Sequence, residues 1–354
     1  MKILQLLHNF KVGGAEQHLI QLCIALREAG HHVEIGAPQL SWIAKRLLKE
    51  GFTVHNFDFK SHIDLISLVR LIFLLKRNRF DLVHTHLVRA ALYGRAATSL
   101  TKIALVSSVH DLTTWKHYPR TRNVIAVSNA VRKHLERRGF AASKINVVYP
   151  GARDLARTEE ARKSIRQQLG LSPEDFAVFL LGRVAEVKGH DIALAAIKKL
   201  RAEHGPSIKL FFVGQKTEWG EKIYDGKNAD FAVWLGYRDD IPQLICATDL
   251  CIQPSRSEGL PLALMEAASA SKPLIGTRVG GIPEVIEDGQ NGLLIPPEDS
   301  EALAQAISSL FKNPELAKCF GIKSRESYEK NFSIEKMVED TLTVYKKILS
   351  PHDA

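Results

Sequence analysis

Short apolar runs alternate with amphipathic segments along most of the 354-residue chain. Segments with helical spacing lie between the runs. The helical segments include 65–77, 130–138, 192–201 and 300–311. The apolar runs predict strands at 2–7, 32–37, 53–57, 82–85, 104–109, 124–127, 146–148, 176–181, 209–214, 249–254, 273–277 and 291–296. Strands that alternate with helices indicate α/β architecture with parallel, doubly wound sheets, which bind ligands beyond the carboxyl ends of their strands.

The periodicity lapses and charged residues accumulate between residues 149 and 173, which indicates a domain boundary. We therefore expect an N-terminal domain at 1–160, a second domain at 161–332 and a terminal helix at 333–354. Ser333 is a suitable cap for that helix. Its apolar residues fall on one side, at Ile334, Met337, Val338, Leu342, Tyr345, Ile348 and Leu349.

The stretch 255–267 combines turn chemistry with acidic residues. Helical spacing follows Pro261, a residue that suits a first helical turn. Glu258 and Gly259 should then lie on a strand-to-helix turn, and Glu266 about one turn into the helix. The first N–H groups of such a helix are unpaired and attract anions. Two carboxylates beside an anion site suit a ligand with phosphates and hydroxyl groups, whereas the alternative is a solvated loop with a surface glutamate.

Other predicted strands also end in residues that could bind a ligand. The pair Gly13 and Gly14 follows the first strand and allows close approach of the backbone, although a plain tight turn would look the same. The Gly-x-Gly-x-x-Gly dinucleotide fingerprint is absent. His86 and His110 lie at or just past the ends of two later strands, and a lone histidine is more often structural than functional.

Arg183 and Lys188 lie on the loop after the strand predicted at 176–181. Arginine presents a planar fork that can hold two phosphate oxygens, and lysine supplies a mobile point charge. Two exposed basic residues with no ligand are the ordinary alternative. The strand–loop–helix context is the one that a phosphate-binding motif requires.

Taken in order, these stretches resemble the retaining glycosyltransferases of family 4 (glycosyl transferases group 1), which have the GT-B fold. The resemblance begins with the Glu-x7-Glu pattern of Glu258 and Glu266 and covers nearly the whole chain. The further motifs are Gly13-Gly14-Ala15-Glu16, His84-Thr85-His86, Val109-His110-Asp111, Val127-Ser128-Asn129-Ala130-Val131, Gly182-Arg183 with Lys188-Gly189, Gly236-Tyr237-Arg238-Asp239-Asp240 and Gly280-Gly281-Ile282-Pro283-Glu284. It implies two Rossmann-like domains that face each other across a cleft.

The resemblance also implies a nucleotide-sugar donor, linked to UDP or GDP, with no metal site and no further cofactor. Arg183 and Lys188 would bind the donor diphosphate and, with the helix start at 259–262, stabilise the charge of the leaving group. Glu266 would hold the ribose hydroxyls, and Glu258 those of the transferred sugar. The implied catalytic residues are His110, Glu258, Arg183 and Lys188. The implied donor-binding residues are Gly13, Gly14, Arg183, Lys188, Arg238, Glu258, Gly259, Leu260, Pro261 and Glu266.

Some of these roles are specific to the family. His110 would contact the donor sugar, and His86 matches a family position next to it. Gly13 and Gly14 would lie near the donor phosphates and the acceptor. Backbone groups near Arg238 would read the nucleobase.

Two stretches depart from the family pattern. The chain has Tyr149-Pro150-Gly151-Ala152 where relatives usually have Pro-Asn-Gly, which leaves the acceptor or hinge role of that loop open. Gln215-Lys216 follows Gly214 where relatives commonly have Gly-x-Gly. Close approach of the donor at that second loop is therefore open as well.

Composition favours a soluble globular protein of the cytoplasm. Hydrophobic residues make up 45% of the chain and charged residues 25%. The four cysteines show no Cys-x-x-Cys spacing, and the N-terminus has no signal-peptide core. The most apolar segment, 63–75, is too short to span a bilayer and contains Asp64, Ser67 and Arg70.

Charge is distributed unevenly. Residues 1–165 contain 26 Lys+Arg and 12 Asp+Glu, a difference of +14, whereas 166–354 contain 22 and 27, a difference of −5. The basic half could face anionic lipid, an acidic glycan or nucleic acid, or be a solvated surface. Nucleic acid is the least favoured, because aromatic residues do not interleave with the basic ones. We expect peripheral contact of the segment 63–79 with the inner face of the cytoplasmic membrane, with an ordinary core helix as the alternative.

The sequence thus predicts a retaining glycosyltransferase that uses a glycan or lipid-linked acceptor, in cell-surface polysaccharide or lipopolysaccharide biosynthesis. A nucleotide-sugar epimerase of the same architecture fits the ordered motifs less well. A dinucleotide-dependent oxidoreductase would need the missing glycine fingerprint. A catalytically silent sugar-nucleotide-binding module would not need Glu258, Glu266, Arg183 and Lys188 all intact.

Overall fold

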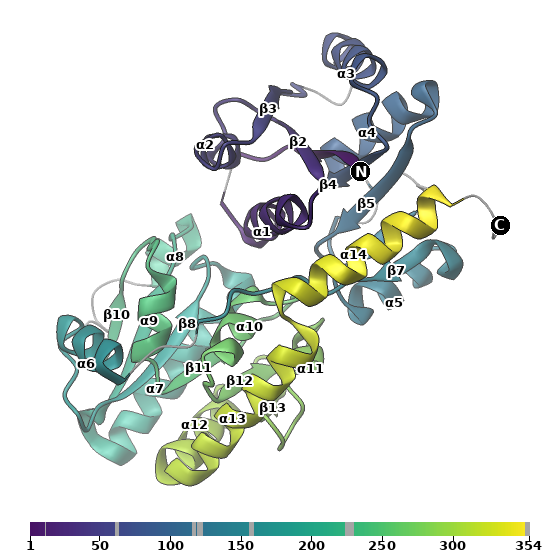
Figure 1. The fold of residues 1–354 in the computed structure, drawn as a ribbon. Coiled ribbons are helices and arrows are strands. Elements are labelled where there is room, and N and C mark those ends of the chain that lie inside the picture. The colour runs from purple at the N-terminus through teal and green to yellow at the C-terminus, as the bar shows by residue number, and fades with distance from the viewer. Residues whose placement is uncertain are drawn as a thin grey trace. The chain divides into compact units, whose positions relative to one another are not determined.

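The structure, a computed structural model, describes residues 1–10, 12–60, 64–114, 118, 123–155, 159–223 and 230–350. The chain divides into two compact units, Met1–Gly151 with Ile334–Ala354 and Ala152–Ser333 (Figure 1). The first boundary falls earlier than the expected residue 160. The reason is that Ala152 already belongs to the second unit, where its N–H donates to the carbonyl of Phe332 at 2.8 Å.

The first unit is built on a seven-stranded parallel sheet with the order β3-β2-β1-β4-β5-β6-β7. The strands are β1 (Lys2–Leu7), β2 (His32–Ala37), β3 (Thr53–Asn56), β4 (Leu82–His86), β5 (Ala104–Val109), β6 (Val124–Ala126) and β7 (Ile145–Val147). β1 pairs with β4 in the register that sets Leu7 opposite His86. The strand order reverses between β1 and β4, and this reversal is where doubly wound sheets bind ligands.

Helices cover both faces of this sheet. They are α1 (Gly14–Glu28), α2 (Trp42–Lys49), α3 (Leu65–Asn78), α4 (Val88–Thr101), α5 (Asn129–Arg137) and, from the end of the chain, α14 (Ile334–Leu349). α14 packs on α1, and its Met337, Val344 and Tyr345 join the core that β1 and α1 form. α3 and α4 cover a second core, in which Leu71 and Leu75 of α3 are fully buried.

The second unit contains a six-stranded parallel sheet with the order β10-β9-β8-β11-β12-β13. The strands are β8 (Phe176–Leu181), β9 (Ile208–Val213), β10 (Ala232–Trp234), β11 (Leu250–Gln253), β12 (Leu274–Thr277) and β13 (Gly292–Ile295). The order reverses between β8 and β11, as it does between β1 and β4 in the first unit. The two sheets therefore share one doubly wound topology.

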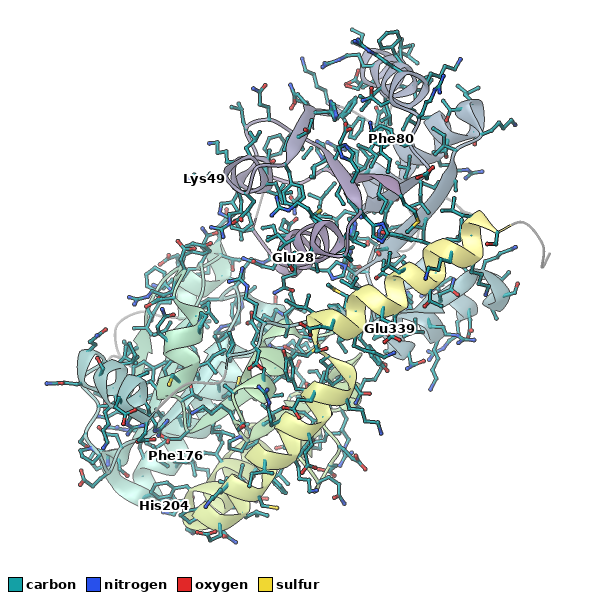
Figure 2. All side chains as sticks on the ribbon, in the orientation of Figure 1. Glu28, Lys49, Phe80, Phe176, His204 and Glu339 are labelled. Carbon is teal, nitrogen blue, oxygen red and sulfur yellow. The ribbon has the colours of Figure 1, made fainter. Side chains whose placement is uncertain are left out.

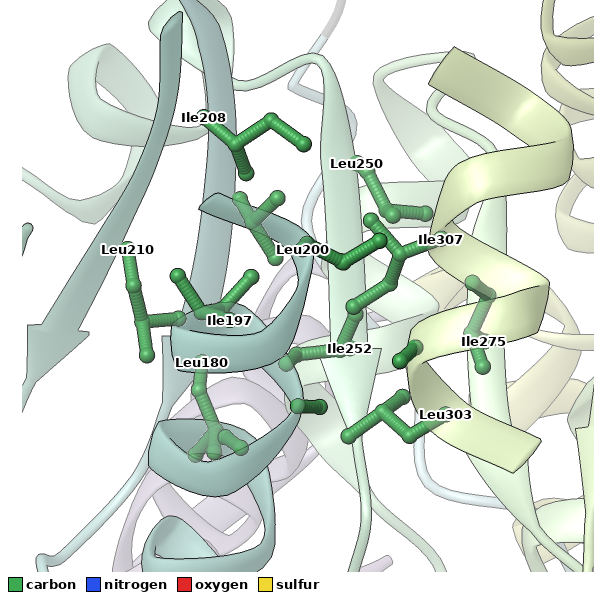
Figure 3. Close-up of a cluster of buried hydrophobic side chains, with 14 of the residues drawn as sticks. Leu180, Ile197, Leu200, Ile208, Leu210, Leu250, Ile252, Ile275, Leu303 and Ile307 are labelled. Atoms are coloured by element: carbon green, nitrogen blue, oxygen red, sulfur yellow. The ribbon is translucent and has the colours of Figure 1, made fainter. Parts of the chain in front are cut away.

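Eight helices surround this sheet in the described part of the second unit. They are α6 (Glu159–Gln168), α7 (His190–His204), α8 (Glu218–Ile223), α9 (Ile241–Ala247), α10 (Leu262–Ser269), α11 (Ile282–Val285), α12 (Ser300–Lys312) and α13 (Pro314–Asn331). Among them, α7, α12 and α13 bury an aliphatic core against the sheet. Figure 3 shows Leu200 of α7 and Leu303 and Ile307 of α12 gathered over Ile252 of β11. Burial of one such side chain contributes about 1.5–3 kcal/mol to the free energy of unfolding. The sheet is thus a stable base for the loops at its carboxyl edge.

The predicted strands are present with ends that differ by at most two residues, but the elements that were not predicted include β10, α6 and α13. α6 occupies part of the charged stretch that was expected to separate the domains. Arg166 is its one buried residue, and it donates to Asp249 at 2.8 Å, so α6 is attached by charge and not by an apolar stripe. α13 buries Gly321 and Ser324 beside Phe320 and Tyr328. Small and polar residues in its buried face hide the apolar periodicity.

Candidate functional site

The loops at the carboxyl edge of the second sheet pack backbone against backbone. A Cβ atom on Gly189 would lie 1.9 Å from the carbonyl oxygen of Pro254, and one on Gly280 would lie 1.8 Å from that of Glu258. Both glycines also have positive φ angles, +70° and +52°. Only glycine fits these two positions. The loops after β8, β11 and β12 therefore form one continuous edge, which we call the second-unit rim.

Lys188 and Glu258 are in direct contact on this rim. The Lys188 Nζ lies 2.5 Å from Oε1 of Glu258, and the hydroxyl of Ser255 donates to the same oxygen at 2.9 Å. The amide of Gln253 adds a longer contact of 3.3 Å. The Glu258 side chain is only 9% exposed, less than expected for a loop carboxylate. Three donors therefore fix this carboxylate in one position before any ligand arrives.

Arg183 lies at the start of the same loop that carries Lys188. Its side chain is exposed. Among the residues that the structure describes, no hydrogen-bond or ion-pair partner of its guanidinium is found. Arg183 thus differs from Lys188, whose charge is already balanced by Glu258.

The start of α10 lies on the second-unit rim as well. Gly259, Leu260 and Pro261 are buried and lead into the helix, and no side chain of the described residues caps its first turn. The first N–H groups of an uncapped helix remain available to an anion. Glu266 follows one turn later and is half-buried. Desolvation raises its pKa to about 7, while Arg153 acts in the opposite direction.

The side chain of Arg238 is already engaged. Its guanidinium forms a two-pronged ion pair with Asp240, with distances of 2.7 and 2.5 Å, and both residues are near the surface. A ligand at this position would therefore meet backbone groups. At the neighbouring departure from the family pattern, Lys216 lies over the ring of Trp234 at 3.9 Å, and the Trp234 indole donates to Gly214 at 2.7 Å.

Arg256 holds the rim together, although the sequence did not single it out. Its guanidinium donates to both carboxylate oxygens of Asp191 at 3.0 and 2.8 Å, and to those of Glu298 at 2.5 and 2.8 Å. These partners are 65 and 42 residues away along the chain, so no local sequence pattern predicts the contacts. Arg256 fixes the loop that presents Glu258.

In the first unit, Gly13 and Gly14 lie where β1 passes into α1. Gly13 precedes the helix in an extended conformation, and no side chain of the described residues caps the first turn. Glu16 of the same motif is buried and accepts a hydrogen bond of 2.8 Å from the Asn9 amide. Glu16 therefore shapes the loop from within. Lys11 lies outside the described residues.

Four histidines gather at the carboxyl edge of the first sheet, and we call them the histidine cluster: His18 of α1, His84 and His86 of β4, and His110 just after β5. Burial, with the neighbouring His84 as the second cause, lowers the pKa of His110 to about 3. The pKa values of the other three are well below the ordinary value for the same reason. The cluster is therefore neutral at physiological pH.

A hydrogen-bond chain from α14 orients this cluster. The Gln5 amide donates to the Tyr345 hydroxyl at 3.2 Å, and that hydroxyl lies 2.6 Å from Nδ1 of His84. Nε2 of His86 lies 2.9 Å from the amide oxygen of Gln5, and its Nδ1 lies 3.2 Å from Nε2 of His110. An amide oxygen can only accept. The proton of His86 is therefore on Nε2, and its Nδ1 lone pair faces His110.

The predicted site residues thus form two groups, each at the carboxyl edge of its own sheet. In the first unit the group consists of Gly13, Gly14 and His110, with His86 beside it. In the second unit the group consists of Arg183, Lys188, Arg238, Glu258, Gly259, Leu260, Pro261 and Glu266. Sequence reasoning missed Arg256, Ser255 and Gln253 on the second-unit rim and Gln5, His18 and Tyr345 around the histidine cluster.

Two protein-family models match the chain. The model described as Glycosyltransferase Family 4 matches residues 12–154, and the model described as Glycosyl transferases group 1 matches residues 161–327. The two matches together take in most of the chain and one lies in each unit. The chain belongs to the GT-B glycosyltransferases of family 4.

Individual relatives agree with this family. The chain is 26% identical to N-acetyl-alpha-D-glucosaminyl L-malate synthase of Bacillus anthracis, over 96% of this chain and 95% of the relative. It is 24% identical to D-inositol 3-phosphate glycosyltransferase of Mycobacterium marinum, over 97% and 83%. Both relatives are named for glycosyl transfer or for the synthesis of a glycosylated product. The likeness extends over nearly the full length of this chain.

Solved structures share the fold. HepE of Anabaena, crystallised in complex with UDP, superposes with a TM-score of 0.87 at 23% identity, over 98% of this chain and 100% of that one. WaaG, a glycosyltransferase involved in lipopolysaccharide biosynthesis, superposes with a TM-score of 0.75 at 17% identity, over 98% and 99%. Within the part of the chain that the structure describes, none of the helices has the length and hydropathy needed to span a bilayer.

Proposed function

We propose that this glycosyltransferase moves a sugar from a nucleotide-sugar donor, linked to UDP or GDP, to a glycan or lipid-linked acceptor. The observation that carries the proposal is the second-unit rim, which carries Lys188, the fixed carboxylate of Glu258, the start of α10 and Arg183, whose guanidinium has no partner among the described residues. The Anabaena protein HepE has been crystallised with UDP and with UDP-glucose. Cell-surface polysaccharide or lipopolysaccharide biosynthesis is the proposed setting.

The donor diphosphate would bind to Arg183 and Lys188. Arg183 has no competing partner among the described residues, so its fork is free to take two phosphate oxygens. Lys188 has one contact with Glu258 and two further ammonium hydrogens to share. Gly259 and Leu260 lead to the start of α10, where the N–H of Leu262 adds the positive end of the helix dipole, since Pro261 has no N–H.

The two glutamates would then hold hydroxyl groups. Glu258 would accept from hydroxyls of the transferred sugar and stabilise the positive charge that develops on it. Glu266 would accept from the two ribose hydroxyls in its ionised form. Its pKa of about 7 means that both protonation states are present near neutral pH. Backbone groups near Arg238 would contact the nucleobase.

His110 is proposed to contact the transferred sugar from the first unit. Because Nε2 of His110 donates to His86, its Nδ1 carries a lone pair that can accept from a sugar hydroxyl. The N–H groups of Gly13 and Gly14 at the start of α1 would face the donor phosphates and the acceptor. His110 positions the sugar in this scheme and does not exchange a proton with it.

We propose that transfer retains the anomeric configuration, as the resemblance to the family implies. The bond between the anomeric carbon and the diphosphate oxygen breaks, and negative charge grows on the diphosphate where Arg183, Lys188 and α10 stabilise it. The acceptor hydroxyl attacks from the same face and gives its proton to the departing phosphate oxygen. All charge is handled by side chains and helix N–H groups, so the step needs no cofactor.

Acceptor-dependent release of nucleoside diphosphate tests the proposal. Purified protein is incubated with UDP- and GDP-sugars, with and without acceptor extracts, and released UDP or GDP is measured. A transferase releases diphosphate when an acceptor is added, and NMR of the product shows the anomeric configuration. An epimerase would convert the donor into its epimer without consuming an acceptor, with the nucleotide still attached in the product, and a silent binding module would bind donors and leave them unchanged.

The α3 face suggests where the acceptor is met. Four large apolar side chains of this helix are exposed: Leu65 at 67%, Ile66 at 75%, Val69 at 64% and Phe73 at 63%. Their spacing places them on one stripe of the helix, opposite the buried Leu71 and Leu75. Figure 2 shows side chains projecting from α3 into the space around the unit. Ile63 lies outside the described residues.

We infer that this face binds the anionic inner surface of the cytoplasmic membrane. Arg70 on α3 and the basic residues Lys76, Arg77 and Arg79 at its end are all exposed, beside the apolar stripe. Apolar side chains enter a membrane interface while basic ones meet anionic headgroups, at about 1 kcal/mol per charge. We expect sedimentation with anionic vesicles that weakens at high salt and in Phe73→Gln. Equal failure to bind anionic and neutral vesicles would favour a soluble acceptor.

A further inference from the structure

The histidine cluster contains more than one orienting partner for His110. We propose that His18, His86 and His110 form a site for a single borderline transition-metal cation, with Zn²⁺ as the representative. Each of these histidines offers one nitrogen, and within the described residues the three nitrogens all lie within 4.8 Å of one another. They come from three separate elements, α1, β4 and the end of β5, so the fold brings them together.

The ring positions fit one shared ion. The ring centroids are 5.7 Å apart for His18 and His86, 5.2 Å for His18 and His110, and 5.4 Å for His86 and His110. Tetrahedral Zn²⁺ with Zn–N bonds of about 2.0–2.1 Å holds imidazole centroids about 5 Å apart. The three rings therefore already have the spacing of three ligands on one tetrahedral ion. Rotation of the rings would direct one nitrogen of each toward the ion.

The nitrogen atoms support the same site. Nδ1 of His86 and Nε2 of His110 are 3.2 Å apart, close to the roughly 3.3 Å between two nitrogens on one tetrahedral ion. Nδ1 of His18 is buried and has no hydrogen-bond partner among the described residues. A buried nitrogen without a partner is unfavourable, and a cation would supply the missing interaction.

Gln5 gives His86 the orientation of a metal ligand. Histidines that bind metals usually donate the other ring N–H to a carbonyl or carboxylate, which fixes the tautomer. His86 does so through Nε2 to the Gln5 amide oxygen at 2.9 Å, which leaves Nδ1 for the ion. His84 is excluded as a ligand although its ring lies 4.2 Å from that of His86, because Tyr345 and Ser108 occupy both of its nitrogens.

Binding of the metal ion releases no proton from the histidines, so it requires no external proton acceptor. All three imidazoles are neutral, so each already carries one lone pair for a ligand bond. His110 would exchange its Nε2 proton for one on Nδ1 and replace its hydrogen bond to His86 by a bond to the ion. Three protein nitrogens leave one position open for water or a ligand oxygen.

The donor set selects the type of cation. Imidazole nitrogens suit Zn²⁺, Co²⁺, Ni²⁺ and Cu²⁺, whereas Mg²⁺ and Ca²⁺ require oxygen ligands. His18 and His86 are buried and His110 is half-buried, so the ion would enter on the side of His110. His110 belongs both to this site and to the proposed sugar contact, but metal binding is measured without any donor.

Metal titration of untagged protein tests the site. Calorimetry with Zn²⁺ and visible absorption with Co²⁺ should show one cation per chain, and Mg²⁺ should not bind. His18→Asn and His110→Asn should each weaken Zn²⁺ binding at least about tenfold, because even the loss of a group that only orients a metal ligand weakens binding by about 10–100-fold. Circular dichroism reports whether each variant folds. The half-buried His110 gives a usable variant if His18→Asn does not fold.

A second group of histidines in the same unit supplies the matched control. His32 and His55 lie 3.0 and 2.6 Å from the carboxylate oxygens of Glu34. His55→Asn should leave the binding of one Zn²⁺ unchanged. No stoichiometric binding, or binding that survives His18→Asn and His110→Asn, or binding that is lost in His55→Asn would each overturn the proposed site.

Discussion

The carboxyl edges of the two sheets have the same topology and opposite chemistry. In the first unit this edge contains the histidine cluster, which is mostly buried and neutral, and in which His86 is hydrogen-bonded to His110 and to Gln5. In the second unit the edge is charged, with Lys188 paired to Glu258 and Arg256 paired to Asp191. Burial keeps charge out of the first edge, whereas ion pairs and partial exposure keep charge in the second.

We propose that one architecture is divided here between two tasks. A doubly wound sheet fixes where a ligand binds and leaves the chemistry to the loops. Charge in the second-unit rim suits a diphosphate. Neutral hydrogen-bonding groups in the histidine cluster suit a hydroxyl-rich sugar. Four perturbations separate these two contributions.

Glu258→Gln should have the largest effect. The change keeps the shape of the side chain and its contact with Ser255, but removes the charge that faces Lys188 and, in the proposed site, the transferred sugar. Loss of one preorganised electrostatic contact lowers turnover by about 10²–10³-fold. Steady-state kinetics with saturating donor measures it, and Glu315→Gln, an exposed carboxylate on α13, is the control. Unchanged turnover would remove Glu258 from the reaction.

Arg183→Ala and Lys188→Ala should weaken the binding of UDP or GDP. A charge-assisted hydrogen bond contributes about 1.5–3 kcal/mol, so each change should raise the dissociation constant by about one to two orders of magnitude. Calorimetry gives the affinity. Arg278→Ala, which removes an exposed arginine paired with Asp288, should leave the affinity unchanged. Equal affinity in all three variants and the parent would refute the diphosphate assignment.

Tyr345→Phe should affect stability in the first unit. It leaves the Gln5 amide and His84 Nδ1 without their shared partner, which costs about 1–3 kcal/mol for buried polar groups. Chemical denaturation measures the free energy of unfolding. Tyr328→Phe in the second unit is the comparison, because its hydroxyl donates to the Ala152 carbonyl at 3.0 Å. A smaller loss of unfolding free energy in Tyr345→Phe than in Tyr328→Phe would show that the hydrogen bonds of Tyr345 contribute little to stability.

The affinity for nucleotide should decrease as the pH decreases, because Glu266 becomes protonated. Its pKa is raised to about 7 by desolvation, so the ionised form that accepts ribose hydroxyls declines as the pH drops below that value. One such group changes affinity by at most about tenfold between pH 8 and pH 6. Calorimetry across this interval measures the slope, and Glu266→Gln corrects for titration of the nucleotide itself. The same slope in parent and variant would contradict the ribose role.

The sequence predicted the architecture well because apolar runs mark every strand longer than three residues. It did not predict α6, which Arg162 and Arg166 attach to Asp249 through ion pairs. Spacing and family likeness identified Lys188 and Glu258 as site residues, but not their contact, since 70 residues separate them. The assembly of His18 with His86 and His110 was equally invisible. It depends on which strands are neighbours in the sheet, a property of the folded chain.

The position of α14 also determines the order in which the protein can mature during synthesis. The ribosome makes β1 and α1 first, yet the core around them lacks Met337, Val344 and Tyr345 until the last helix has emerged. The second unit, Ala152–Ser333, has by then been translated in full and has all of its own strands. Domains generally fold as units during translation, the N-terminal one first. Here the N-terminal unit is the last to be completed, and a nascent chain released before α14 would lack the tyrosine that orients the histidine cluster.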